Sequence, residues 1–168
     1  MKAAVKHNIS DFKDYLKSND IYMEENIDEN DGSVHFSVGL ETEAGAKIQL
    51  IAAFQNEHPT VDIYCFNVAH VPDATATNDI LHVINELNTS YRFAKFTLNK
   101  QNAIDISTSL AFSEPNFNPA LVFEHTRMLY KLANDGIQKL NESDLGINKR
   151  MGCKQHHPFI SISYQSTF

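Results

Sequence analysis

Three side chains that commonly bind metal ions lie close together near the end of the sequence, at Cys153, His156 and His157. Cysteine thiolate and histidine imidazole are the usual zinc ligands, and a tetrahedral zinc site needs four ligands. No second pair of such residues is spaced to complete the set. We therefore interpret the three residues as part of a solvated tail and predict no bound metal and no other cofactor. A metal-dependent enzyme that uses them is the alternative.

Nucleophilic catalysis has a candidate thiol, Cys65, and two candidate bases, His82 and His125. A catalytic cysteine needs a base held within hydrogen-bond distance. Cys65 falls in the apolar phase of an expected strand, where a small buried residue is ordinary. His125 falls at a core-spaced position of an expected helix, and we expect it to be hydrogen-bonded at the edge of the helix interface. The sequence thus predicts no catalytic residues, and a cysteine-dependent enzyme is a second form of the alternative.

The acidic turn at residues 28–32 does not fit a calcium-binding loop. That loop needs glycine at its sixth position and glutamate at its twelfth, counted from a first aspartate. Counted from Asp28, Gly32 is fifth and Gly39 is twelfth. We therefore expect this turn to connect two strands in solvent.

The composition is that of a globular protein without nucleic-acid or membrane partners. The 168 residues are 42% hydrophobic and carry a formal net charge of −7, from 21 acidic and 14 basic residues. An acidic surface repels phosphate groups, which argues against nucleic acid and anionic membranes. The longest apolar run, residues 50–54, is far shorter than the roughly 20 residues of a membrane-spanning helix. We also expect no signal peptide, a cytoplasmic location and reduced thiols.

Apolar spacing in the first half of the chain predicts a helix followed by an antiparallel meander. Ile9, Phe12 and Leu16 recur at helical spacing, and Asn8 or Ser10 is the expected cap. Alternating apolar residues then predict four strands, around residues 21–26, 34–41, 48–54 and 61–66. The expected inner-face residues are Val34, Phe36, Val38, Leu40, Ile48, Leu50, Ala52, Phe54, Val61, Ile63 and Cys65.

The second half of the chain is expected to add a helix, a hairpin and a longer helix. The helix is expected to begin behind a cap at Thr75, Thr77 or Asn78 and to end near Asn88, with its first apolar position at Ile80. The hairpin is expected at residues 91–98 and 103–110. Asn118 and Pro119 then predict a helix start, because Asn caps free amides and Pro at the first helical position loses no hydrogen bond.

The elements together predict an α+β fold, with an antiparallel sheet backed by helices and the order α-β-β-β-β-α-β-β-α. We expect one domain over residues 1–141, followed by a linker and tail over residues 142–168. The tail contains a possible extra strand at residues 160–164, where apolar and polar residues alternate. Such a strand can pair with an open sheet edge, in its own chain or in a partner.

This order of elements resembles the YbjN-like family of bacterial proteins. The residues that carry the resemblance are Ile-Asn-Glu-Leu-Asn at 84–88, followed by Arg-Phe-Ala-Lys-Phe at 92–96. Members are described as sensory-transduction regulators, with a fold similar to type III secretion chaperones. The resemblance implies a non-enzymatic module that dimerises or holds a partner, and it supplies no catalytic residues.

Apolar residues on the second faces of the strands predict a partner-binding surface. Five side chains are expected to point away from the helices: Ile51, Tyr64, Phe66, Tyr91 and Phe93. Aromatic residues in such a place favour an interface, because each removes a large area from water. A tail or loop that covers them, or a strand phase shifted by one residue, is the alternative. We therefore predict a non-enzymatic protein-binding module of chaperone-like or regulatory type, which works as a homodimer or with a protein or peptide partner.

Overall fold

The structure is a computed structural model, and it describes residues 1–71, 77–113 and 116–142. The predicted order of elements and the α+β class are confirmed. The helices are α1 (Ala3–Ser18), α2 (Thr77–Ser90) and α3 (Pro119–Glu142). The strands are β1 (Glu24–Ile27), β2 (Val34–Glu41), β3 (Lys47–Phe54), β4 (Thr60–His70), β5 (Lys95–Leu98) and β6 (Ala103–Ala111).

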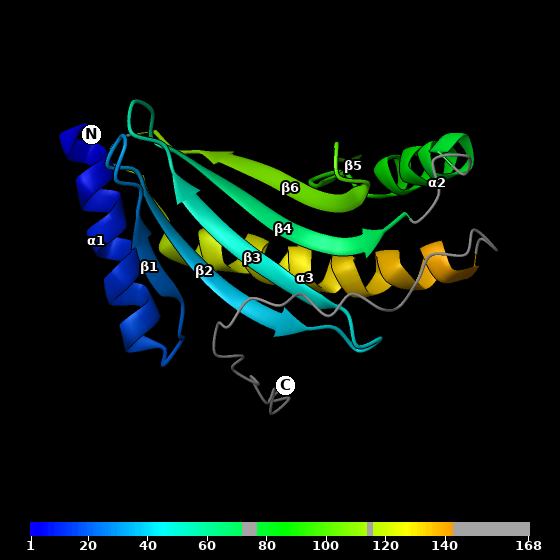
Figure 1. Ribbon diagram of the computed structural model, residues 1–168. Helices are drawn as coiled ribbons and strands as arrows, with labels where there is room; N and C mark the ends of the chain where they lie inside the picture. The colour runs from blue at the N-terminus through cyan, green and yellow to red at the C-terminus, as the bar shows by residue number, and fades with distance from the viewer. Residues whose placement is uncertain (72–76, 114–115, 143–168) are drawn as a thin grey trace.

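The six strands form one antiparallel sheet in the order β1-β2-β3-β4-β6-β5 (Figure 1). The four-residue strands β1 and β5 form its edges, and β3 and β4 are its central pair. Side chains alternate between buried and half-exposed along β3 and most of β4. This alternation shows that one face of the sheet is more deeply buried than the other.

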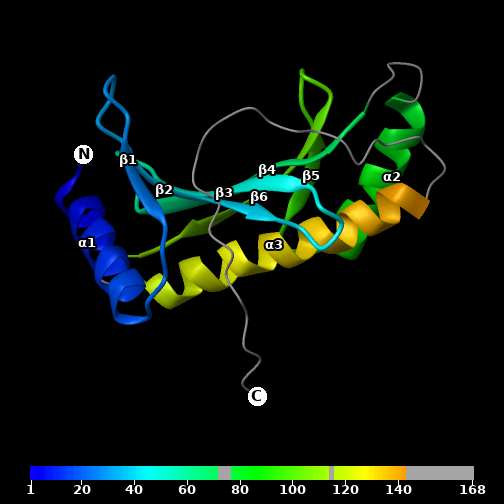
Figure 2. The same ribbon diagram turned by 60° about the horizontal axis from the view of Figure 1, so that its bottom comes forward.

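The helices pack against one face of the sheet. Figures 1 and 2 show α3 running along this face, with α1 beside its first turns and α2 beside its last turns. We call this face the inner face and the opposite one the outer face. Among the described residues, no helix lies over the outer face. None of the described helices has the length and apolar content needed to cross a bilayer.

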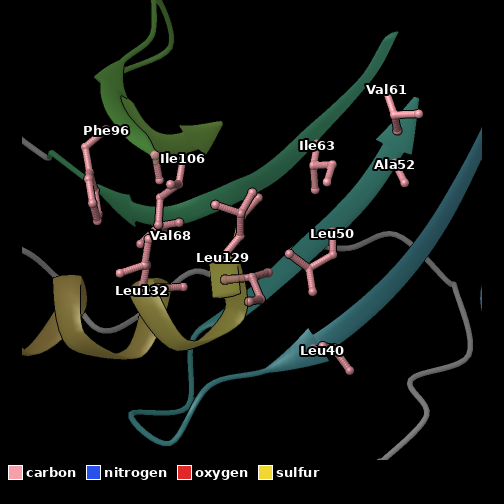
Figure 3. Packing of buried hydrophobic residues seen from close by; sticks show 14 of the residues in the cluster. Leu40, Leu50, Ala52, Val61, Ile63, Val68, Phe96, Ile106, Leu129 and Leu132 are labelled. Carbon is pink, nitrogen blue, oxygen red and sulfur yellow. The ribbon is translucent and has the colours of Figure 1, made fainter. Parts of the chain in front are cut away.

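The core lies between α3 and the inner face of the sheet. Leu129 and Leu132 of α3 point toward the strands, where Leu50, Val68 and Ile106 surround them (Figure 3). Each of these five side chains is almost completely buried. Burial of this apolar surface, at about 25 cal/mol per Å², is the main force that holds the helix on the sheet. The inner-face residues expected from alternation are buried as predicted, except that Val38 is only partly buried.

Helix α1 is held on the sheet by a cluster of aromatic rings. The Phe12 ring centroid lies 5.1 Å from that of Phe36 and 5.6 Å from that of Phe54. Phe12 has no exposed surface, and the Phe12 and Phe36 rings meet edge to face at 78°. Such edge contacts stabilise aromatic pairs beyond the area they bury.

Helix α1 begins earlier than the sequence indicates. It starts at Ala3, with Lys2 as a cap residue that offers no side-chain hydrogen bond. Val5 is buried and extends the apolar stripe by one turn, whereas Asn8 is a buried residue inside the helix and caps nothing. The expected start behind Asn8 or Ser10 is therefore wrong. At α3 the expected cap is confirmed, because the side-chain oxygen of Asn118 accepts the Leu121 N–H at 3.2 Å.

The junction between α2 and β5 also differs from the expected one. The predicted strand from Tyr91 begins at Lys95, and α2 continues to Ser90. The side-chain oxygen of Asn88 accepts the Phe96 N–H at 2.7 Å, and its amide donates to the Phe96 carbonyl at 3.0 Å. Asn88 thus satisfies both main-chain groups of Phe96, as a neighbouring strand would. These bonds give the Asn at position 88 a structural role.

Candidate protein-binding surface

Three of the five predicted surface residues gather at the centre of the outer face. Ile51 lies on β3, while Tyr64 and Phe66 lie on β4. Ile51 and Tyr64 are direct cross-strand partners, and Phe66 lies one pleat further along, opposite Gln49. All three are partly exposed. The residues on either side of Ile51 and of Tyr64 are buried on the inner face, whereas Phe66 lies between buried Cys65 and exposed Asn67. We call Ile51, Tyr64 and Phe66 the outer patch.

The outer patch combines Ile51 with two stacked aromatic rings. The rings of Tyr64 and Phe66 stack with centroids 5.4 Å apart and planes 12° from parallel. The neighbouring outward positions hold four small residues, Ser37, Gly39, Ala53 and Ser107, and two larger polar ones, Gln49 and Asp62. Aromatic rings of this kind, one of which carries a hydroxyl group, are typical of protein interfaces.

The Tyr64 hydroxyl group remains protonated well into the alkaline range. Partial burial, and then the nearby carboxylate of Asp62, raise the pKa of Tyr64 above its ordinary value. Asp62 itself is fixed on the same face, because one oxygen accepts a bond from Gln55 and the other accepts a bond from the Ser109 hydroxyl group. The patch therefore presents a hydrogen-bond donor next to a carboxylate that is already engaged.

A β-bulge ends the patch on β4. Pairing between β4 and β6 shifts register between Cys65 and Ala69, and Asn67 adopts a left-handed φ of 63°. The carboxylate of Asp105 on β6 accepts the Asn67 N–H at 3.0 Å and the Asn99 side-chain amide at 2.7 Å. Bulges bend a strand and fix its local twist. Sequence analysis missed both Asp62 and Asp105, because an outward carboxylate on a strand normally indicates only solvent.

Tyr91 does not lie on the outer face, contrary to the prediction. Its ring centroid is 5.8 Å from that of buried Phe96, and the Lys139 ammonium of α3 lies 5.2 Å from its centroid. These contacts place Tyr91 on the helix side, because Phe96 is an inner-face residue and Lys139 belongs to α3. The expected phase fails here because Tyr91 follows a helix and is not part of β5.

Phe93 is 65% exposed, but it is separate from the outer patch. It precedes β5 at the sheet edge, and β6 lies between β5 and the patch strand β4. Of the five predicted residues, three lie together at the centre of the outer face. Tyr91 lies on the helix side of the sheet, and Phe93 is exposed at the sheet edge.

The residues considered for catalysis are not arranged for it. Cys65 has no exposed surface, and burial, with a smaller effect of Asp105, raises the pKa of its thiol far above the ordinary value. A thiol in this state supplies no thiolate at neutral pH. His82 is exposed on α2 and lies 3.3 Å from a Glu86 oxygen, while His125 donates from Nδ1 to the Leu121 carbonyl at 3.0 Å. The hydrogen bond expected for His125 is confirmed.

The acidic turn connects β1 and β2 as expected. Asp28 accepts the Asn30 N–H, and Asp31 accepts the Ser33 N–H, both at 2.8 Å. The bond from Ser33 lowers the pKa of Asp31 below its ordinary value. Within the part of the chain that the structure describes, no three His, Cys, Asp or Glu side chains are grouped to hold a metal ion. Cys153, His156 and His157, and the expected strand at 160–164, lie outside the described residues.

The buried thiol gives a prediction for alkaline stability. The Cys65 thiol loses its proton near pH 9.0 in the unfolded chain but keeps it in the folded protein. The free energy of unfolding therefore falls as the pH rises above 9, by at most about 1.4 kcal/mol per pH unit from this group. Urea unfolding at pH 8, 9 and 10 measures the slope, which we expect to be smaller in Cys65→Ala. An equal slope in both proteins would contradict the burial of this thiol.

Comparisons with known proteins find a structural likeness and no family. No protein-family model and no curated protein matches the chain. Among solved structures, the search finds YbjN from E. coli, a proposed transcription regulator. The chain resembles YbjN. The alignment covers 80% of this chain and 91% of YbjN, with 11% sequence identity and a TM-score of 0.49. At this identity and TM-score the resemblance carries no argument about function, which must come from the side chains of this protein.

Proposed function

We propose that this chain is a non-catalytic protein-binding module whose binding site is the outer patch. The observation that carries the proposal is the placement of Ile51, Tyr64 and Phe66, partly exposed on the two central strands, with the described helices on the opposite face. Aromatic side chains at the centre of a patch supply much of the free energy of binding in protein interfaces. The buried state of Cys65 argues against catalysis by this thiol.

The charge of β1, β2 and their turns indicates the chemistry of the partner, because β2 lies next to the patch strand β3. Between Lys17 and Lys47 the sequence contains no lysine or arginine. The same stretch, which includes β1, β2 and their turns, contains eight acidic residues: Asp20, Glu24, Glu25, Asp28, Glu29, Asp31, Glu41 and Glu43. Complementary charge steers a partner to its site and favours a basic partner here. We therefore propose an extended peptide segment that carries apolar and basic side chains.

A defined selection tests this function. Random dodecapeptides displayed on phage are selected against the full chain, and the enriched peptides are synthesised. We expect sequences with apolar and basic residues, whose Kd rises at least about tenfold in Tyr64→Ser and Phe66→Ser, a loss of about 1.4 kcal/mol. Leu81→Ser, at a 47% exposed site on α2, is the matched control and should bind as the wild type does. Equal binding by all four proteins would contradict the proposal.

The homodimer predicted from the sequence would place a second copy of the chain on the outer patch. The same variants distinguish this occupant from a peptide. Light scattering measures the mass of the wild type and of Phe66→Asp. A mass of 19.0 kDa for both is the result expected for a patch that binds a peptide. A wild-type mass twice that value, with Phe66→Asp returning to 19.0 kDa, would show that a second copy occupies the patch and would overturn the peptide assignment.

A further inference from the structure

We infer that the first occupant of the outer patch is the chain's own C-terminal segment, residues 143–168, so that a partner must displace it. This inference rests on the proposed function and adds regulation to it: the module would control access to its own site. Three observations carry the inference, namely the charge of the segment, its apolar pattern and the place where α3 ends.

The segment is basic, whereas the rest of the chain is acidic. Residues 143–168 contain Lys149, Arg150 and Lys154 against Asp144, a formal charge of +2. Because the whole chain carries −7, residues 1–142 carry −9. The segment is thus attracted to the body of the protein. The attraction should be strongest between Lys17 and Lys47, because no lysine or arginine there repels the segment.

The segment also has the apolar pattern that the outer patch suits. Residues 159–164 read Phe-Ile-Ser-Ile-Ser-Tyr, so that Ile160, Ile162 and Tyr164 share one side of an extended chain. An extended segment with one apolar side can bury that side on a flat apolar surface, and its polar serines would then face water. The segment therefore carries apolar and basic side chains, as does the peptide partner proposed above.

Helix α3 passes the turn between β2 and β3 and ends on the side of the sheet where β5 and α2 lie. Along its second half, the Tyr130 hydroxyl group donates to the Glu41 carbonyl at 3.2 Å, and the Asn134 side-chain oxygen accepts the Glu43 N–H at 2.8 Å. The helix thus runs beside the turn between β2 and β3 before it ends at Glu142. The 26 residues that follow span up to about 85 Å when extended. An eight-residue strand such as β2 is only about 27 Å long, so the segment is long enough to reach and cross the outer face.

A spin label at Cys153 tests the inference in the full chain. Cys65 is buried and its thiol stays protonated, so the label attaches at Cys153 under native conditions. We expect the amide signals of Ile51, Tyr64 and Phe66 to broaden, and those of α1 around Phe12, on the inner face, to remain sharp. At 1 M salt the Debye length falls to about 3 Å, and the broadening should decrease. Uniform broadening, or broadening centred on the helices, would overturn the inference.

Charge reversal separates this inference from the proposed function. In Lys149→Glu/Arg150→Glu/Lys154→Glu we expect weaker broadening and tighter binding of a selected peptide, because the competitor is removed. Lys2→Glu/Lys6→Glu/Lys17→Glu makes the same charge change on exposed positions of α1 and its cap. It is the control and should not weaken the broadening, because it makes the body of the protein more acidic. If the peptide binds the patch but the label broadens nothing there, the inference fails and the function stands. If the label broadens the patch but no peptide binds, the proposed function fails.

Discussion

Replacing Phe12 with alanine is expected to lower the free energy of unfolding by about 3–5 kcal/mol, the usual cost of removing a buried ring from a packed core. Phe12 has no exposed surface, and it is the residue of α1 whose ring contacts both Phe36 and Phe54. The substitution leaves a cavity between α1 and the sheet, because the two remaining rings are fixed on neighbouring strands. Urea denaturation followed by circular dichroism measures the loss.

A nearby exposed aromatic residue supplies the control for Phe12. Tyr22 is 53% exposed, and Tyr22→Ala should change the free energy of unfolding by no more than about 0.5 kcal/mol. A loss below about 1 kcal/mol for Phe12→Ala would mean that α1 does not depend on this ring, which would contradict its packing against the inner face.

Replacing Gly136 with alanine is expected to destabilise the protein by about 1–3 kcal/mol, although alanine normally stabilises a helix relative to glycine by about 1 kcal/mol. A Cβ atom at position 136 would lie 2.7 Å from Cε1 of Phe96 and 3.3 Å from its Cζ. The Phe96 ring has little room to move, because it is 1% exposed and packs against Tyr91. Glycine is therefore needed here for the close approach of α3 to β5. Thermal and urea unfolding both measure the effect.

A double-mutant cycle shows whether the Phe96 ring is the cause. Phe96→Leu removes the two ring atoms nearest to the added methyl group, so the Gly136→Ala change should cost less in the Phe96→Leu background than in the wild type. Equal costs in both backgrounds, or stabilisation by Gly136→Ala alone, would contradict the close contact.

The strand faces could be predicted from the sequence because side chains alternate with a period of two. Every β3 and β4 residue expected on the inner face is buried, and Ile51, Tyr64 and Phe66 are on the outer face as expected. Register needs no long-range information in such strands, since a shift by one residue would expose the whole apolar set. The start of α3 could also be predicted from local sequence, because the Asn118 cap and Pro119 act within one turn.

The errors arise where long-range contacts override a local pattern. Tyr91 looks like part of a strand, but its position depends on Phe96 and on Lys139, which lies about fifty residues further along the chain. Asp62 and Asp105 acquire their roles from partners on other strands or turns, and no local pattern indicates these partners. The early start of α1 has a similar cause, because Val5 is buried by tertiary packing and no side chain caps the helix.

The central claim is that the outer patch binds an extended peptide, and chemical-shift mapping tests it most directly. The ¹⁵N-labelled full chain is titrated with a selected apolar and basic peptide, and amide shifts are followed by NMR. The account predicts that the largest shifts centre on Ile51, Tyr64 and Phe66 and that they disappear in Phe66→Ser. Shifts centred on α2 or α3, or shifts that persist in Phe66→Ser, would contradict it.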